Sequence, residues 1–453
     1  MFQKVLIANR GEIAVRIIRA CRELGIRTVA VFSEADRSAL HAQIADEAIC
    51  IGPARTADSY LNIKAILAAC ELTGAEAIHP GFGFLSENAS FARTCQKCGV
   101  TFIGPTPEAM EMMGDKATAK MTMKNAGVPV VPGSDGLIKT LAQAKIIAEE
   151  VGYPVMVKAS AGGGGRGIRK VDRPEDLEAA ITAARQEASS FFGDDGVYLE
   201  KFIVNPRHVE IQLLADNYGH VVALGERDCS LQRRNQKVLE ESPCPVMTPS
   251  LRKAMEEAAV RAARACGYRN AGTVEFLLSG KDFYFMEMNT RIQVEHPITE
   301  MVTGVDLVKS QLRIAAGLPL ELRQEDVMLT GHAIECRINA ENPSEGFRPS
   351  PGEIQALHMP GGPGIRIDSA VYQGYEISPY YDSMIAKLIA YAPTREEAFM
   401  KMKWALAEFL VAGVDTNIDF QLNLIRDPDV EAGRYDIGFL GRNSHLIPKK
   451  ERD

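Results

Sequence analysis

Short apolar runs alternate with stretches of helical periodicity over residues 1–115. The apolar runs are Lys4 to Ala8, Thr28 to Phe32, Ala77 to His79 and Phe102 to Ile103, and the helical stretches are Glu12 to Leu24 and Tyr60 to Thr73. This order of strand and helix predicts βαβ units and a parallel sheet. Sharp turns follow two of the strands, at Asn9 to Gly11 and at Pro80 to Gly83, where an open sheet of this kind places its ligands.

The pattern changes after a predicted helix over Lys116 to Asn125 and a breaker-rich stretch that ends near Gly136. Strands are predicted at Pro154 to Ala159, Ile168 to Val171, Tyr198 to Phe202, His208 to Ala215, Val221 to Glu226, Thr273 to Leu278 and Phe283 to Asn289. An amphipathic helix is predicted at Pro174 to Ser189. Since several of these strands are joined by hairpin-like turns, we expect an antiparallel α+β region.

The last segment begins at about Gly331. It mixes Gly/Pro turns with strands at His332 to Asn339 and Ile354 to His358 and one strong helix at Arg395 to Phe409. That helix contains Met400-Lys401-Met402, a triplet like the one at which biotin is attached to carrier domains. A carrier lysine sits at the tip of an exposed β-turn, so the helical periodicity argues against a biotin attachment site here.

Composition narrows the class of protein. The 453 residues are about three times the roughly 150 that usually form one core, which predicts two or three domains. Apolar residues make up 46% and charged residues 24%, as in ordinary globular proteins. A net charge of -8 argues against nucleic acid as the main partner. No apolar run reaches membrane-spanning length, and the N-terminal apolar run is too short for a signal peptide. The nine cysteines do not have the spacing of a disulfide framework. We therefore expect a cytoplasmic protein.

A glycine-rich segment runs from Gly162 to Gly167 between two predicted strands. It satisfies the dinucleotide-binding pattern, but that pattern joins a strand to a helix, so a flexible lid over phosphates fits this context better. Lys158 lies on the strand that leads into the segment, where its ammonium could reach the same phosphates. The alternative is a glycine-rich surface hairpin.

Two acids and an amide are predicted to converge on one hairpin. Side chains alternate along a strand, so Glu287 and Asn289 point to the same face. A tight turn at Gly280-Lys281 places Glu275 within about one residue of the position opposite Glu287. Such hard oxygen ligands suit Mg²⁺ shared with nucleotide phosphates. The alternative is a pair of solvated acids, although facing like charges are unfavourable without a cation between them.

Polar side chains are dense immediately after this hairpin, from Asn289 through Glu295 to Glu300, as in an active-site segment. Earlier in the chain, Gln232 to Lys237 places three cations within six residues of an otherwise acidic protein. A basic surface loop is the alternative for this second segment.

Together these segments resemble the biotin carboxylase subunit of bacterial acyl-CoA carboxylases, which is an ATP-grasp enzyme. The resemblance rests on Lys4 to Ala14, His79 to Asn88, the glycine segment, Arg207 to Gln212, Glu287 to Pro297 and Tyr380 to Met384, in that order. It implies a mixed α/β and α+β fold in three domains. These are a Rossmann-like N-terminal domain at residues 1–115, an ATP-grasp domain at 116–330 with a mobile lid near 131–203, and a mixed β/α C-terminal domain at 331–446.

The resemblance also implies roles for individual residues. The ATP contacts would be Lys116, Lys158, Gly164, Gly165, Glu200, Lys201, Phe202, Ile203, His208, Gln232, Asn235, Glu275 and Glu287, and the metal ligands Glu275, Glu287 and Asn289. The bicarbonate and biotin pocket would contain Lys237, Arg291, Gln293, Val294 and Arg337, with Glu295 as the general base. Asn235 stands where relatives often have His, so an ionic role at that position is in doubt.

The activity implied is ATP-dependent carboxylation of biotin with bicarbonate, through carboxyphosphate, as the first half-reaction of acetyl-CoA carboxylase in fatty acid synthesis. ATP and Mg²⁺ or Mn²⁺ would be required, and biotin would be attached to a separate carrier protein. A carboxyltransferase would be a further partner, and the enzyme would form a homodimer. Two alternatives remain at this point: an ATP-grasp enzyme with another acceptor, and a nucleotide-binding regulatory module without turnover.

Overall fold

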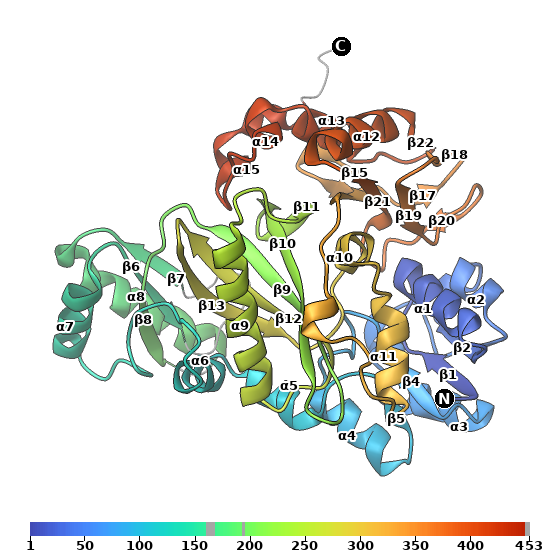
Figure 1. The fold of residues 1–453 in the computed structure, drawn as a ribbon, viewed down its shortest axis with the longest axis horizontal. Coiled ribbons are helices and arrows are strands. Elements are labelled where there is room, and N and C mark those ends of the chain that lie inside the picture. The colour runs from blue at the N-terminus through green and yellow to red at the C-terminus, as the bar shows by residue number, and fades with distance from the viewer. Residues whose placement is uncertain (160–167, 193–194, 449–453) are drawn as a thin grey trace.

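The structure is a computed structural model that describes residues 1–159, 168–192 and 195–448. Figure 1 shows the N-terminal region in blue beside a central sheet, a smaller teal unit on the far side of that sheet, and the C-terminal region in red above it. The glycine segment, with Gly164 and Gly165, lies outside the described residues. Among the described residues, no helix combines the length and the hydropathy needed to cross a membrane.

The N-terminal region is built on a parallel sheet. Its strands are β1 (Lys4–Ile7), β2 (Arg27–Phe32), β3 (Glu47–Cys50), β4 (Ala77–His79) and β5 (Thr101–Phe102), in the order β3-β2-β1-β4-β5. Its helices are α1 (Gly11–Glu23), α2 (Leu40–Ile44), α3 (Ile63–Thr73), α4 (Ala89–Lys97) and α5 (Pro107–Gly114). The predicted βαβ alternation is confirmed. The pattern did not predict β3, because this edge strand alternates half-buried and exposed residues and has no continuous apolar run.

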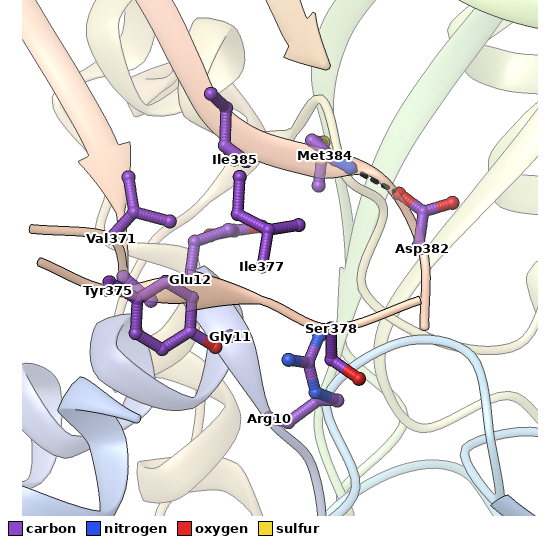
Figure 2. A pocket seen from close by; sticks show the side chains of 11 residues that line it. Arg10, Gly11, Glu12, Val371, Tyr375, Ile377, Ser378, Asp382, Met384 and Ile385 are labelled. Atoms are coloured by element: carbon purple, nitrogen blue, oxygen red, sulfur yellow. Dashed lines mark hydrogen bonds between the residues drawn. The ribbon is translucent and has the colours of Figure 1, made fainter. Parts of the chain in front are cut away.

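The turns after β1 and β4 pack against protein instead of facing an open crevice. Asn9 Nδ2 donates hydrogen bonds to the carbonyls of Pro80 and Phe82, at 2.6 and 2.7 Å. Arg10 pairs with Asp36, and its guanidinium lies 4.2 Å from the ring centre of Tyr381, which comes from the C-terminal region. Figure 2 shows the pocket beside Arg10, which is lined by residues of the N-terminal and C-terminal regions. Its volume is about 30 Å³. That volume holds little more than a water molecule, and the ligand site expected at these turns stays a prediction.

A small unit projects from the central sheet. It contains α7 (Leu141–Val151), β6 (Val155–Ala159), β7 (Ile168–Val171), α8 (Leu177–Phe192) and β8 (Val197–Lys201), with the strands in the order β7-β6-β8. Its buried core, which includes Val157, Ile181 and Leu199, is separate from the other cores. The two ends of the unit are joined by hydrogen bonds from Lys201 N to Pro132 O and from Ser134 N to Leu199 O.

The central sheet is antiparallel and continuous across residue 331. Its strands are β9 (Arg207–Ala215), β10 (Val221–Arg233), β11 (Gln236–Ser242), β12 (Asn270–Ser279), β13 (Asp282–Asn289), β14 (His332–Asn339), β19 (Ile365–Ser369) and β21 (Met384–Ala392). Their order is β13-β12-β9-β10-β11-β14-β21-β19. The predicted antiparallel pairing is confirmed, but β10 continues seven residues beyond its predicted end at Glu226. The apolar pattern did not predict this extension, because it contains polar residues such as Arg227 and Asp228, although both are buried.

Helices and short strands complete the fold. The helices are α6 (Lys116–Asn125), α9 (Pro249–Ala265), α10 (His296–Thr303), α11 (Leu307–Ala315), α12 (Arg395–Glu408), α13 (Ile418–Ile425), α14 (Pro428–Glu431) and α15 (Phe439–Arg442). The short strands are β15 (Glu341–Asn342), β16 (Arg348–Pro349), β17 (Gly352–Glu353), β18 (Ala356–His358), β20 (Glu376–Ile377) and β22 (Leu410–Ala412). The predicted strand Ile354 to His358 is confirmed only over β18, which begins at Ala356 and pairs with β22.

The helix predicted around Met400-Lys401-Met402 is α12. Met402 is buried in the C-terminal core, and Lys401 Nζ donates a hydrogen bond to Pro363 O at 2.8 Å. This geometry agrees with the prediction that the triplet is no biotin attachment site.

Candidate active site

Three acids form a row across one face of the central sheet. Glu275 on β12 is directly opposite Glu287 on β13 and, on its other side, opposite Glu210 on β9. The turn at Gly280-Lys281 sets the register as far as Phe276 and Phe285, and a register shift next to Glu275 then places it opposite Glu287, within the one residue that the sequence predicted. Glu210 and Glu275 are buried, whereas Glu287 is exposed at the end of the row. Adjacent like charges on a sheet are unfavourable, so this row requires cations nearby.

Lys237 supplies one of those cations. Its Nζ lies 2.7 Å from Glu210 Oε2, 3.0 Å from Glu275 Oε1 and 2.6 Å from Glu295 Oε1. The turn between β10 and β11 places Lys237 there, with Arg234 and Asn235 at its tip, both with positive φ. Burial by itself would lower the pKa of Lys237, but the three carboxylates outweigh it and raise that pKa well above its usual value. The lysine is therefore charged.

Arg337 on β14 holds Glu295 from the other side. Its Nη2 lies 3.0 Å from Glu295 Oε2, and its Nε donates a hydrogen bond to Glu240 Oε1 at 2.7 Å. Glu295 is the N-cap of α10 and is fully buried. Burial would raise the pKa of Glu295, but the charges around it, led by Lys237 and Arg337, hold that pKa well below its usual range. Glu295 is therefore ionised and can accept a proton.

Arg291 lies beside this group, at the start of the segment that leads to α10. Its Nη2 contacts Asn289 Oδ1 at 3.1 Å, and its Nη1 contacts Gln293 Oε1 at 3.0 Å. Glu87, from the N-terminal region, accepts hydrogen bonds from Arg291 Nε and from Thr290 N, both at 3.0 Å. The N-terminal region therefore takes part in orienting Arg291.

The backbone at Val294 is fixed by Lys387, a buried residue of β21. Lys387 Nζ donates a hydrogen bond to Val294 O at 2.9 Å and pairs with Glu12 of α1 at 3.1 Å. This lysine thus links the N-terminal helix, the C-terminal sheet and the segment before α10.

The Glu275 end of the row can hold a divalent cation. Asn289 Nδ2 and Gln293 Nε2 donate to Glu275 Oε1 at 2.8 and 3.0 Å. Although the Glu287 side chain is exposed, partial desolvation by the surrounding protein and the charge of Glu275 raise its pKa, as expected for two acids that face each other. Two carboxylates and an amide oxygen are the hard donor set that Mg²⁺ prefers, and a cation between the acids would relieve their repulsion. The residues present therefore fit a magnesium ion.

A second group of predicted residues lies between the small unit and α6. Lys158 Nζ and Lys120 Nζ contact the two carboxylate oxygens of Glu200, at 2.6 and 2.8 Å. Lys201 directs its Nζ to the carbonyls of Gly152 and Tyr153, while Phe202 lies 4.9 Å from Lys170 Nζ.

His208 connects this region with the acid row. Its Nε2 lies 3.0 Å from Glu275 Oε2, and its Nδ1 lies 2.9 Å from Gln232 Nε2. Burial by itself would lower the pKa of His208, but Glu275 and Glu210 together outweigh burial and raise that pKa.

The structure therefore brings together most of the residues predicted for the site. The set joined by direct contacts is His208, Gln232, Lys237, Glu275, Asn289, Arg291, Gln293, Glu295 and Arg337. Lys116 and Asn235 are exposed at the edge of this set, and Ile203 is half-buried after β8.

Several contacting residues were missed from the sequence. Glu210 follows His208 by two positions on β9, so strand alternation could have found it. Lys120 follows Lys116 by one helical turn, which is a similar local signal. Glu87, Glu240 and Lys387 gave no local signal, because each meets its partner only through tertiary packing.

Comparisons with known proteins agree over the whole length of the chain. The family described as "Biotin carboxylase, N-terminal domain" matches residues 1–110, "Carbamoyl-phosphate synthase L chain, ATP binding domain" matches 115–323, and "Biotin carboxylase C-terminal domain" matches 335–442. The chain is 59% identical over 442 residues to Biotin carboxylase 1 of Bacillus subtilis, covering 97% of this chain and 98% of that one. It is 56% identical to the biotin carboxylase of Haemophilus influenzae, with 99% of both chains covered.

Solved structures give the same result. The biotin carboxylase domain dimer of the Hydrogenobacter thermophilus 2-oxoglutarate carboxylase, in complex with MgADP, ADP and bicarbonate, matches with a TM-score of 0.91 and 53% identity over all of both chains. A Campylobacter jejuni biotin carboxylase in complex with β,γ-ATP matches with a TM-score of 0.92 and 50% identity, covering 98% of this chain and 99% of that one.

Proposed function

The chain belongs to the biotin carboxylase family, and from this premise we propose that it uses ATP and bicarbonate to carboxylate the biotin of a separate carrier protein. It is an ATP-dependent ligase of the ATP-grasp type. The observation that carries the proposal is the contact of Glu295 with both Lys237 and Arg337, beside the row of acids. This arrangement puts a base and two cations within reach of one small anion.

Bicarbonate would bind where these cations meet. Lys237, Arg291, Gln293, the backbone of Val294 and Arg337 would hold the anion, and Glu295 would remove its proton. In the structure Lys237 and Arg337 are paired with Glu295. A bound bicarbonate would partly neutralise these two cations. They would then stabilise the ionised form of Glu295 less, so the proton affinity of Glu295 would rise when it must act as the base.

The deprotonated bicarbonate oxygen then attacks the γ-phosphorus of ATP, ADP leaves, and carboxyphosphate forms. Carboxyphosphate breaks down to carbon dioxide and phosphate, and the phosphate takes the proton from the biotin ureido nitrogen. That nitrogen attacks carbon dioxide to give carboxybiotin. Arg337 would stabilise the enolate-like charge on the ureido oxygen during this step, because a fixed cation in a partly buried site costs no reorganisation.

ATP would lie between the central sheet and the small unit. Lys116, Lys158, His208, Gln232 and Asn235 would contact the nucleotide, together with the hinge run Glu200 to Ile203 and the glycine residues Gly164 and Gly165. The separate core of the small unit supports a lid near residues 131–203 that moves as one body. Its closure would keep water from carboxyphosphate. We propose three domains, at residues 1–115 (N-terminal), 116–330 (ATP-grasp) and 331–446 (C-terminal).

Glu275, Glu287 and Asn289 would hold Mg²⁺, which neutralises phosphate charge in nucleotide sites. Because Glu287 is exposed at the end of the row, its replacement should weaken metal binding without disturbing the buried core. We expect Glu287→Gln to raise the Mg²⁺ concentration needed for half-maximal ATP cleavage by about 10-fold or more. A titration of the initial rate with Mg²⁺ measures this.

Asp282→Asn is the matched control for this prediction. It removes one exposed carboxylate from the same strand at the position opposite Ser279, five residues from Glu287. An unchanged Mg²⁺ requirement in Glu287→Gln, or an equal shift in Asp282→Asn, would remove Glu287 from the metal site.

The acceptor biotin would be carried by another chain, because Lys401 lies within a helix. A biotin carboxyl carrier protein and a carboxyltransferase are the proposed partners, with acetyl-CoA as the downstream substrate in fatty acid synthesis. A homodimer is proposed from the dimer of the Hydrogenobacter relative. All nine cysteines are free thiols, which supports the cytoplasm as the location.

An assay of ADP release tests the function. With Mg²⁺-ATP, we expect ADP release to require bicarbonate and to rise on addition of free biotin or of a biotinylated carrier, with carboxybiotin as the product. ADP release that is independent of bicarbonate and insensitive to biotin would indicate another acceptor. ATP binding without ADP release would indicate a regulatory module.

A further inference from the structure

Behind Arg337 lie two buried acids that the reaction as described does not use. Glu240 on β11 and Glu335 on β14 are directly opposite each other, and both are fully buried. Glu335 precedes Arg337 by two residues on the same strand, so the two side chains share a face. Glu240 Oε2 and both carboxylate oxygens of Glu335 have no hydrogen-bond partner among the described residues.

The two acids relate differently to Arg337. Glu240 Oε1 accepts a hydrogen bond from Arg337 Nε at 2.7 Å and lies 2.5 Å from Nη2. No such contact joins Arg337 to Glu335 among the described residues. Glu240 is therefore the acid that fixes the guanidinium.

This contact occupies one edge of the guanidinium. Nη2 is shared between Glu240 and Glu295, whereas Nη1 has no hydrogen-bond partner among the described residues. The side chain of Arg337 is 19% exposed although both of its acidic partners are completely buried. An arginine has five donors in a rigid planar fork, so fixing one edge also fixes the direction of the other.

We propose that Glu240 is a positioning residue: it holds the Nε edge of Arg337 so that Nη1 is presented to the substrates. This inference rests on the proposed function, because it assigns a support to Arg337. Glu240 touches neither bicarbonate nor biotin in this scheme and acts only through the arginine.

Charge balance indicates that Glu335, unlike Glu240, is protonated. Burial raises the pKa of Glu335 well above its usual value, and the nearby Lys387 only partly offsets this. A second ionised carboxylate opposite Glu240 would be repelled. Burial raises the pKa of Glu240 to about 7, but its direct contact with Arg337 favours the charged form, and Glu335 has no such contact among the described residues. Glu335 is thus the uncharged member of the pair, and it provides a matched control.

The test compares Glu240→Gln, Glu335→Gln, Arg337→Ala and the double variant Glu240→Gln/Arg337→Ala in carboxybiotin formation. A misdirected guanidinium should lower kcat of Glu240→Gln by about 10- to 100-fold. The KM for ATP should stay within about 2-fold, because Glu240 contacts none of the proposed nucleotide residues. Glu335→Gln should stay within about 3-fold of the parent, because it replaces a neutral acid by a neutral amide of the same shape.

The double variant separates positioning from an independent role. If Glu240 acts only through Arg337, the double variant should be no more than about 2-fold slower than Arg337→Ala. Should Glu240→Gln fail to fold, Glu240→Asp replaces it. Aspartate keeps the charge but withdraws the carboxylate by about 1.5 Å, and we expect a loss of about 10-fold in kcat.

Three results would overturn the inference while leaving the proposed function intact, provided that Arg337→Ala itself is slow. They are a kcat for the Glu240 variants within about 3-fold of the parent, a full additional loss in the double variant, and a loss in Glu335→Gln equal to that in Glu240→Gln. A fast Arg337→Ala enzyme would instead overturn both the role of Arg337 and this inference.

Discussion

Glu295→Gln is expected to lower bicarbonate-dependent ATP cleavage by about 1,000-fold or more, which is within the range for loss of a general base. Glutamine has the shape of the acid but cannot take the bicarbonate proton. The fold should survive, because Lys237 keeps Glu210 and Glu275 as partners and Arg337 keeps Glu240. Nucleotide binding should be nearly unchanged. ADP release with and without bicarbonate, together with an ATP-binding titration, measures both quantities.

Glu376→Gln is a suitable control for this prediction, because it changes an exposed glutamate on β20 of the C-terminal region. It should behave like the parent enzyme. A marked loss of ATP affinity in Glu295→Gln would mean that Glu295 is a structural acid, and retained bicarbonate-dependent turnover would mean that another group is the base.

Arg337→Ala is expected to slow carboxyl transfer to biotin by about 100-fold or more, since loss of one fixed charge stabiliser has an effect of this size. The arginine is replaced in the middle of the sheet, where Glu240 would lose its cation. Burial already raises the pKa of Glu240, so this acid can take up a proton and does not remain as an uncompensated charge. Carboxybiotin formation measured with free biotin at saturating ATP gives the rate.

Arg337→Lys is the matched variant, because it keeps the charge but loses the planar fork that reaches Glu240 and Glu295 together. We expect it to recover only part of the rate. If Arg337→Ala turned biotin over within a few-fold of the parent, Arg337 would have no role in the transfer step.

The hairpin with the metal acids was predictable because its geometry is local. A two-residue turn sets the register of β12 and β13 to within one residue, and alternation puts Glu287 and Asn289 on one face. The register shift beside Glu275, which completes its pairing with Glu287, was not predicted. In contrast, β10 extends through buried charged residues, because Arg227 is neutralised by Glu210 of the neighbouring strand. An apolar pattern cannot predict such a strand, since the compensating charge lies elsewhere in the sequence.

The turns after β1 and β4 illustrate a second limit. The sequence shows correctly that they follow parallel strands, but their surroundings include Tyr381, which is far away in the chain. Which residues surround a turn is decided by the whole fold. The contact between Glu87 and Arg291 is another example, because the two residues are 204 positions apart in the sequence.

The sequence by itself determined the antiparallel character of the middle region, the hairpin of Glu275 and Glu287 to within one residue and, through an ordered set of motifs, the family. These features depend on neighbouring residues or on motif order along the chain. Only the tertiary structure decided that Lys237 lies among three carboxylates, that Glu295 is held between Lys237 and Arg337, and that Glu240 supports Arg337. The physical reason is that a charge is stabilised by whatever the fold places around it, and in this site those partners come from separate strands and a helix terminus.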